Sequence, residues 1–184
     1  ALKNSKLTRW ILENFDSLKN LFSFFYDKLR DKRRERKIDF KEKYLNKLKE
    51  EEREFLKKMN FNIENGEISA QIDKTKINFL TGGWLEEFVF AEINELVKEK
   101  IIDEAKLSVQ IESEAKNEID VCLIKDNVFY HIECKSLTKD ESENQIINDE
   151  TYKKGMLTTK LGLGDKKRAI ICTTLSKIKD SLKK

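Results

Sequence analysis

The chain has 184 residues, of which 39% are charged, and its 37 basic residues against 34 acidic ones leave a net charge of +3. This length suits one domain or two small ones. No apolar run approaches the ~20 residues of a membrane span, and no signal peptide is evident. Three cysteines, an odd count, argue against a disulfide scaffold. We therefore expect a cytoplasmic protein without membrane contact.

The first part of the chain is predicted to be helical. Apolar residues recur at three- and four-residue steps from Trp10 to Leu29, and again between Asp39 and Lys58. The apolar residues that flank Asn65-Gly66 then predict a β-hairpin, because Asn-Gly is a strong two-residue turn signal. Ile77, Phe79 and Leu80 are expected to add a strand. Residues 1–78 thus form a basic helical extension that ends in a hairpin and resembles a winged helix.

Basic residues are concentrated at Lys28–Lys37, where seven of the ten residues are Lys or Arg. Such a cluster can contact nucleic-acid phosphates. The predicted contacts are Arg30, Arg33, Arg34 and Lys37. Acidic residues are interleaved at spacings that allow i,i+4 pairs, so a solvated helix face is the alternative.

Aromatic residues are frequent in the first helical stretch, at Trp10, Phe15, Phe22, Phe24, Phe25 and Tyr26. Phe24 lies off the main apolar stripe, as a residue facing a second surface would. A small helical layer hides this much aromatic surface with difficulty, so we expect a homodimer. The alternative is that these side chains pack on the domain formed by residues 79–184.

From residue 79 onward the pattern changes to mixed helix and strand. Thr81-Gly82-Gly83 is expected to open a helix that reaches about Lys100. Strands are predicted at 107–111, 119–125 and 128–134, which short turns would join into an antiparallel meander. A helix at about 144–161, a strand at 169–173 and a terminal helix from Ser176 follow. Because a helix precedes the last strand, that strand can return parallel.

The predicted hairpin of residues 117–135 carries the candidate chemistry. If Asp126-Asn127 is its two-residue turn, Asp120 lies directly opposite Glu133, and two carboxylates so close repel each other. A divalent cation such as Mg²⁺ would compensate this charge. Lys135 shares the face of Glu133, and a hard metal beside an ammonium suits phosphodiester hydrolysis. The alternative is an ordinary strand pair with an exposed carboxylate–lysine cluster.

Two further residues belong to this prediction. Glu86 shares a helical stripe with Phe90, Ile93 and Val97, so its carboxylate is expected to face the interior, where a metal, water or lysine would explain it. A partly exposed glutamate is the alternative. His131, the one histidine in the chain, lies on the face of Asp120 and Glu133 and is interpreted as a packed or half-exposed strand residue. A hydrogen bond of its ring within the site is the alternative.

The pattern Ile119-Asp120 with Ile132-Glu133-Cys134-Lys135 resembles the PD-(D/E)xK nuclease superfamily. Together with Gly82-Gly83-Trp84-Leu85-Glu86-Glu87, Tyr152-Lys153 and Leu161-Gly162, it resembles the nuclease domain of CRISPR-ancillary effectors that join a CARF sensor to a nuclease. The resemblance implies an α/β restriction-endonuclease-like core at 79–184: a helix, a three-strand antiparallel meander, a second helix and a fourth strand.

By the same resemblance, the chain is a Mg²⁺- or Mn²⁺-dependent endonuclease acting on DNA or RNA, within antiviral defence. Its catalytic residues are Glu86, Asp120, Glu133 and Lys135, its metal ligands Asp120, Glu133 and Cys134, and Lys153 contacts nucleic acid. No CARF-like segment precedes the nuclease in this sequence, so the chain is expected to be a fragment, a stand-alone relative or a subunit whose sensor lies elsewhere. The alternative function is a catalytically silent nucleic-acid-binding or assembly module with the same fold.

Overall fold

The computed structural model describes residues 5–111, 117–136 and 167–174. The chain divides into two compact units, an N-terminal unit of Lys6–Trp84 and a C-terminal unit that starts at Leu85. The sequence suggested a boundary between residues 78 and 79, but the Trp84 indole packs within the N-terminal unit, 5.5 Å from the Phe15 ring and 5.6 Å from the Phe22 ring. In the described ranges no helix combines the length and apolar character needed to cross a membrane.

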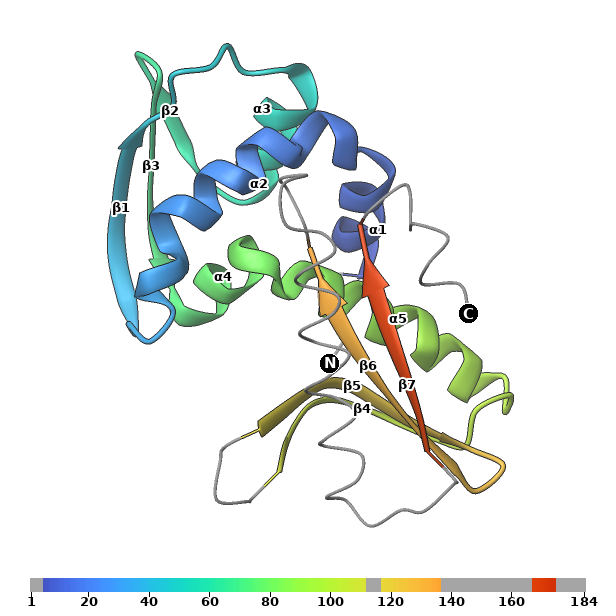
Figure 1. The fold of residues 1–184 in the computed structure, drawn as a ribbon. Coiled ribbons are helices and arrows are strands. Elements are labelled where there is room, and N and C mark those ends of the chain that lie inside the picture. The colour runs from blue at the N-terminus through green and yellow to red at the C-terminus, as the bar shows by residue number, and fades with distance from the viewer. Residues whose placement is uncertain (1–4, 112–116, 137–166, 175–184) are drawn as a thin grey trace, which may run out of the picture. The chain divides into compact units, whose positions relative to one another are not determined.

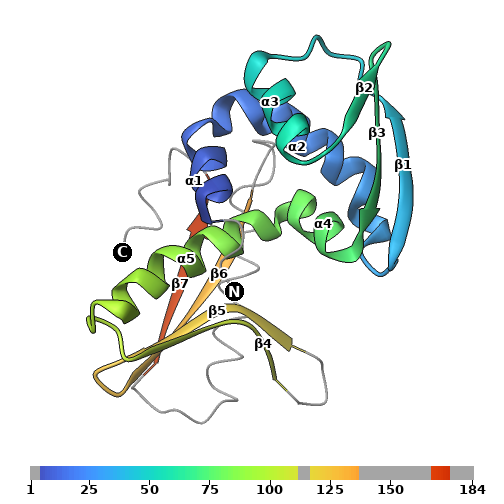
Figure 2. The same ribbon diagram turned by 180° about the vertical axis from the view of Figure 1, so that it is seen from behind.

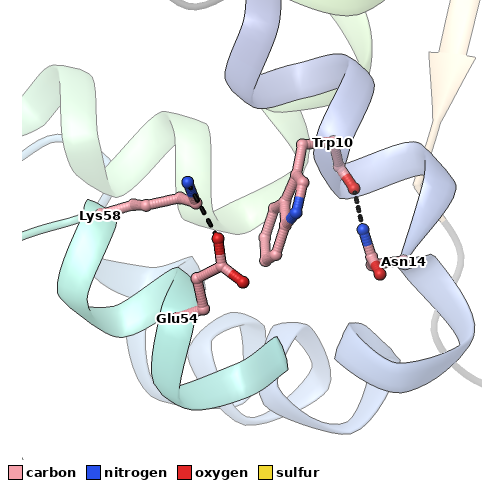
Figure 3. Close-up of polar contacts among 4 residues, drawn as sticks. All are labelled: Trp10, Asn14, Glu54 and Lys58. Atoms are coloured by element: carbon pink, nitrogen blue, oxygen red, sulfur yellow. Dashed lines mark hydrogen bonds and ion pairs between the residues drawn. The ribbon is translucent and has the colours of Figure 1, made fainter. Parts of the chain in front are cut away.

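The N-terminal unit begins with helices α1 (Ser5–Glu13) and α2 (Phe15–Leu29), followed by a 3-10 turn at Arg30–Lys32. Asn14 lies between the two helices, and its Nδ2 donates a hydrogen bond to the Trp10 carbonyl at 2.8 Å (Figure 3). The predicted apolar stripe is buried, with exposures of 2% or less at Ile11, Leu18, Leu21, Phe22, Phe25 and Leu29. The helical prediction for this stretch is therefore confirmed.

The helix predicted over residues 39–58 is wrong in its first part. Strand β1 (Lys37–Lys43) occupies that part, and only α3 (Glu50–Lys58) is helical. Phe40 is buried while its neighbours Asp39 and Lys41 are exposed, which is the two-residue alternation of a strand. On α3, Lys58 pairs with Glu54 at 3.0 Å and lies over the Trp10 ring at 5.3 Å (Figure 3).

β1 belongs to a three-stranded antiparallel sheet of order β1-β3-β2, with β2 at Asn62–Glu64 and β3 at Glu67–Asp73. Asn65 and Gly66 have φ angles of 50° and 77°, as a two-residue hairpin turn requires, so the predicted hairpin is confirmed. α2 runs beside one face of this sheet (Figures 1 and 2). The predicted helices and hairpin are therefore both present, and β1 is an additional strand that the sequence did not predict.

The phenylalanines of α2 pack inside the N-terminal unit, whereas Tyr26 of the same helix is exposed. Phe24 meets Phe40 at 6.2 Å and Tyr44 at 5.0 Å, in both cases edge to face. Its position off the main stripe is explained by contact with β1 and the residue after it, so the inference of a second surface at Phe24 is wrong. Among the described residues of this unit, the large apolar side chains that stay exposed are Leu12, Tyr26 and Leu45. The homodimer remains a prediction.

A buried carboxylate stabilises the start of α3. Glu52 is 1% exposed, and its Oε1 accepts a hydrogen bond from the Tyr44 hydroxyl at 2.8 Å. Its Oε2 accepts from the Lys49 backbone N–H, also at 2.8 Å, in a capping box. Burial, together with the bond to Glu52, raises the pKa of Tyr44 to about 12. The phenol therefore stays protonated and keeps donating at neutral pH.

We expect Tyr44→Phe to lower the free energy of unfolding by about 1.5–3 kcal/mol, because Glu52 loses a hydrogen bond inside the unit. The pKa of Tyr44 is higher in the folded chain, about 12, than its ordinary value of 10.0. Its contribution to stability is therefore complete below pH 10 and is lost as the pH rises toward 12. Urea denaturation at neutral and alkaline pH measures both effects. Tyr26→Phe, at an exposed ring, is the control, and equal stability of the two variants would contradict the assignment.

The chain then passes through α4 (Lys74–Asn78), a π-helical turn (Phe79–Gly83) and α5 (Trp84–Lys98). The strand predicted at Ile77, Phe79 and Leu80 is wrong. Asp73 caps the segment, since its Oδ1 accepts from the Lys76 N–H at 2.8 Å, and the helix begins directly after β3. α5 itself confirms the helix expected after the glycine pair.

The C-terminal unit contains a four-stranded sheet of order β4-β5-β6-β7. Its strands are β4 (Glu104–Ile111), β5 (Asn117–Lys125), β6 (Val128–Lys135) and β7 (Lys167–Thr173). The first three form the predicted antiparallel meander, and β7 runs parallel to β6. α5 covers one face of this sheet (Figures 1 and 2). The α/β fold class is confirmed, whereas the helices predicted at 144–161 and from Ser176 lie outside the described residues.

Candidate active site

The β5–β6 hairpin has the predicted register. Asp126 and Asn127 form its turn with φ angles of 52° and 60°, and Val121 pairs with Ile132. Continuing this register by one residue places Asp120 opposite Glu133. The two candidate metal ligands therefore come from adjacent strands at the same height of the sheet.

The two faces of the hairpin differ as the sequence suggested. The face covered by α5 is apolar and buried, with Ile119, Val121, Leu123, Ile132 and Cys134 at 8% exposure or less. The other face carries Asp120, Glu133 and Lys135. Glu133 is only 6% exposed and His131 is completely buried, so this polar face is also covered in part. A carboxylate at such a position needs compensation of its charge.

Lys135 supplies that compensation within the chain. Its Nζ lies 2.8 Å from Glu133 Oε1, and the two side chains are 31% and 7% exposed. A metal ion was the compensating charge expected from the sequence, but the lysine two residues along the same strand already provides a positive charge. The ammonium is thus fixed beside the carboxylate rather than extended into solvent.

Asp120 is bound to the neighbouring strand. Its Oδ2 accepts a hydrogen bond from the Cys134 backbone N–H at 2.7 Å. A carboxylate that accepts from a backbone N–H forms a short, charge-assisted bond. Asp120 therefore also helps to hold β5 against β6 at the point where the candidate site begins.

Glu86 comes from the first turn of α5 and is half-buried. The buried stripe of α5 runs through Leu85, Val89 and Ile93, so Glu86 lies at its edge rather than at its centre. Even so, Glu86 affects Cys134. The hydrogen bond to Cys172 and burial raise the pKa of the Cys134 thiol most, and the negative charges of Asp120 and Glu86 raise it further. Glu86 and Asp120 thus approach the same residue of β6.

Two thiols lie side by side between the strands. Cys134 pairs directly with Cys172 in the parallel β6–β7 register. The hydrogen bond between them raises the pKa of Cys134 and lowers that of Cys172 to about 7, although burial opposes the second shift. The Cys134 thiol is the donor and keeps its proton. Since this thiol lies on the apolar face, any metal contact by Cys134 would come from its backbone carbonyl.

Ser108 is a residue near the candidate site that the sequence pattern did not indicate. Leu107 pairs with Val121 and Val109 with Ile119, so Ser108 lies across from Asp120. In the described part of the sheet, Ser108 and Asp120 do not form a strand pair. Ser108 has a φ of 54°, uncommon for a residue other than glycine. The sequence signal was only a hydroxyl between two apolar residues, which is too general to indicate a site.

The donor set fits a hard cation that keeps water ligands. Within the described ranges, no three His, Cys, Asp or Glu side chains come close enough together to hold a metal ion. The two carboxylates of Asp120 and Glu133 instead match the one or two carboxylates with which proteins bind Mg²⁺. The thiols of Cys134 and Cys172 suit softer metals, but they face away from these carboxylates.

The predicted phosphate contacts Arg30, Arg33, Arg34 and Lys37 lie in the N-terminal unit, and they differ in how far their side chains are available to bind a phosphate. Arg33 is already engaged, because its Nε donates to Thr81 Oγ1 at 2.9 Å and its Nη2 donates to the Thr81 carbonyl. Arg30 lies 3.8 Å from Asp31, a weak surface pair. Arg34 and Lys37 are exposed and make no ion pair with the described part of the chain. Lys153 lies outside the described residues.

Comparison with known proteins gives one family match. The family described as "Card1-like, endonuclease domain" matches residues 73–181, which include Glu86, Asp120, Glu133 and Lys135. No curated protein matches the chain.

Two of the solved structures that match this chain illustrate the shared fold. Protein VC1899 from Vibrio cholerae has a TM-score of 0.68 at 18% identity, and the match covers 97% of this chain and 48% of that one. Can2 from Sulfobacillus thermosulfidooxidans, solved in complex with cyclic tetra-adenylate, has a TM-score of 0.71 at 18% identity, with the same coverages of 97% and 48%. The chain thus spans about half the length of each.

Proposed function

Because the chain belongs to the Card1-like endonuclease domain family, we propose that it is a divalent-metal-dependent nuclease that hydrolyses phosphodiester bonds of DNA or RNA. The observation that carries this proposal is the grouping of Asp120, Glu133 and Lys135 on one face of the β5–β6 hairpin, with Glu133 and Lys135 in contact at 2.8 Å. A divalent cation held by the two carboxylates, together with the Lys135 ammonium, would give the positive charge that binds an anionic phosphate.

Each residue has a role in this proposal. Asp120 and Glu133 would hold Mg²⁺ or Mn²⁺ together with the Cys134 carbonyl and water. When bound, the cation neutralises the phosphate and makes water a better nucleophile. Lys135 orients the attacking water and stabilises the negative charge that develops on the phosphate. Glu86 would act from α5 as a further catalytic acid outside the set of metal ligands, since the described residues bring no three such side chains together.

The biological setting belongs to the same proposal. Can2 was solved with a cyclic oligonucleotide bound, and this chain matches about half of it. We place the chain in the nuclease portion of a CRISPR-ancillary effector, with ligand sensing assigned to a part of the system outside the residues matched here.

A cleavage assay tests the function. Supercoiled plasmid and end-labelled single-stranded RNA are incubated with the chain in Mg²⁺, Mn²⁺ or EDTA, with Glu133→Gln as the matched control. We expect cleavage of at least one substrate with a metal, and none in EDTA or with the variant. Binding without cleavage under every metal condition would instead establish the silent module with the same fold.

The basic cluster is expected to contribute to affinity rather than to chemistry. Replacing Arg34 and Lys37 by alanine should weaken binding similarly for all sequences. It should also flatten the log–log salt dependence by about 0.9 per lost contact on duplex DNA. Fluorescence anisotropy over a salt series measures the slope, with Lys47→Ala/Arg53→Ala as the charge-matched control. A slope equal to that of the wild type would identify the cluster as a solvated surface.

A further inference from the structure

Tyr26 differs from the other aromatic residues of α2. Phe15, Phe22, Phe24 and Phe25 each pack against further rings of the N-terminal unit, whereas Tyr26 is 41% exposed. In the part of the chain that the structure describes, no aromatic ring lies beside that of Tyr26. A single exposed aromatic residue is ordinary on a protein surface. The groups around the Tyr26 ring therefore decide whether it has a function.

The ring of Tyr26 is held in place by Arg33. The guanidinium carbon of Arg33 lies 5.8 Å from the ring centroid, in a cation–π contact. The same guanidinium is fixed by Thr81, since its Nε donates to the Thr81 hydroxyl at 2.9 Å and its Nη2 donates to the Thr81 carbonyl. Thr81 is 4% exposed and belongs to the same compact unit. Arg33 thus orders the tyrosine ring before a ligand arrives, which lowers the entropy cost of binding on that ring.

Basic side chains surround the ordered ring. Arg30 and Arg33 follow Tyr26 by four and seven residues, so they lie on its side of the helix as α2 continues into the 3-10 turn. Arg30 is exposed and takes part in a weak surface ion pair at 3.8 Å. Arg34 is exposed and makes no ion pair with the described residues. Residues 26–37 include seven basic and three acidic side chains, so an anionic partner is favoured.

An aromatic ring among arginines matches the chemistry of a nucleic-acid strand with unpaired bases. Such a base can stack its flat face on an aromatic ring, while the neighbouring phosphates bind basic side chains. Bases inside a duplex are stacked on one another, so they do not offer this face to a side chain on the outside. We propose that Tyr26 is a base-stacking residue of a nucleic-acid-binding surface on the N-terminal unit, with Arg30 and Arg34 as its phosphate contacts. This inference rests on the proposed nuclease function and adds a binding site outside the residues of the metal site.

Salt dependence distinguishes the two kinds of contact. A phosphate contact releases counterions, so its loss flattens the salt dependence of binding. A stacked base releases none, so loss of Tyr26 should lower the affinity at every salt concentration and leave the slope unchanged. Loss of Arg34 should change the slope instead.

The test measures binding of a fluorescein-labelled thymidine oligonucleotide to the full chain by fluorescence anisotropy in EDTA, where no metal-dependent cleavage occurs. Tyr26→Ala is expected to raise Kd about 5- to 150-fold, the typical effect of losing one base–aromatic stack, at an unchanged salt slope. Tyr26→Phe keeps the ring and should bind like the wild type. Tyr26→Leu keeps an apolar side chain without the ring and should lose affinity as Tyr26→Ala does. Leu45→Ala, at an apolar side chain that is 87% exposed in the same unit, is the control and should have no effect.

A strand of equal length made of abasic units is the second probe, because it keeps the phosphates and lacks the bases. The wild type and Tyr26→Ala should bind this strand equally. The proposal is overturned if Tyr26→Ala binds the thymidine strand as tightly as the wild type does. It is overturned as well if the variant weakens binding of the abasic strand, or of a duplex, by the same factor. A chain that binds as described but never cleaves with any metal would refute the nuclease function and leave the stacking surface standing.

Discussion

Lys135→Ala is expected to lower the cleavage rate by about 10²–10³-fold, the typical effect of removing one group that stabilises charge in the transition state. Lys135 is held 2.8 Å from Glu133, so its ammonium is already oriented before the substrate arrives. Single-turnover cleavage at saturating Mg²⁺ measures the loss. A folded Lys135→Ala protein with full activity would remove Lys135 from the chemistry.

The same substitution should also affect folding without metal. Glu133 is 6% exposed and would lose the positive charge beside it, so we expect the free energy of unfolding to fall by up to about 3 kcal/mol. The double variant Lys135→Ala/Glu133→Gln should recover much of this, because the buried charge is then removed. Lys106→Ala is the control, since Lys106 pairs with Glu104 at 3.1 Å on an exposed surface, where such a pair contributes little.

Asp120→Asn is expected to lower the cleavage rate by at least about 10²-fold while leaving the fold intact. The asparagine side-chain oxygen can still accept the hydrogen bond that the Cys134 N–H donates to Asp120 at 2.7 Å. The negative charge that would hold a divalent cation is lost. Calorimetric titration with Mn²⁺ should therefore show weaker binding although the unfolding transition is nearly unchanged.

Asp120→Ala provides the contrast, because it removes the charge and the hydrogen bond together. We expect an additional loss of about 1.5–3 kcal/mol of stability, as for other hydrogen bonds to charged groups. If Asp120→Asn bound Mn²⁺ as tightly as the wild type, Asp120 would be a structural residue of the β5–β6 pair and not a metal ligand.

The parts of the fold that the sequence predicted correctly are those in which local signals agree. Asp126-Asn127 and Asn65-Gly66 both form the expected two-residue turns, and each turn fixes the register of its hairpin. Because the turn sets the register of β5 and β6, the juxtaposition of Asp120 and Glu133 could be inferred from the sequence alone. The position of Lys135 on the same face followed from strand periodicity.

The errors arose where long-range packing decided the local structure. The segment at Phe40 has apolar spacing that also fits a helix, but pairing of β1 with β3 makes it a strand. Short apolar runs of this kind do not distinguish helix from strand. Arg33 shows the same limit for function, since its sequence neighbourhood is basic and its partner Thr81 lies 48 residues away. Composition indicated charge there but could not indicate the partner.

The turn at Asp126-Asn127 also has a consequence for folding kinetics. Closing that turn brings Asp120 and Glu133 together as a local event, and hairpins form in about 1–10 μs. β7 pairs in parallel with β6, so it can dock only after the longer chain between Lys135 and Lys167 has closed. We therefore expect the two carboxylates to meet early, while Cys172 reaches Cys134 in a later and slower phase. The charges of the candidate site would then be assembled before the last strand covers one edge of it.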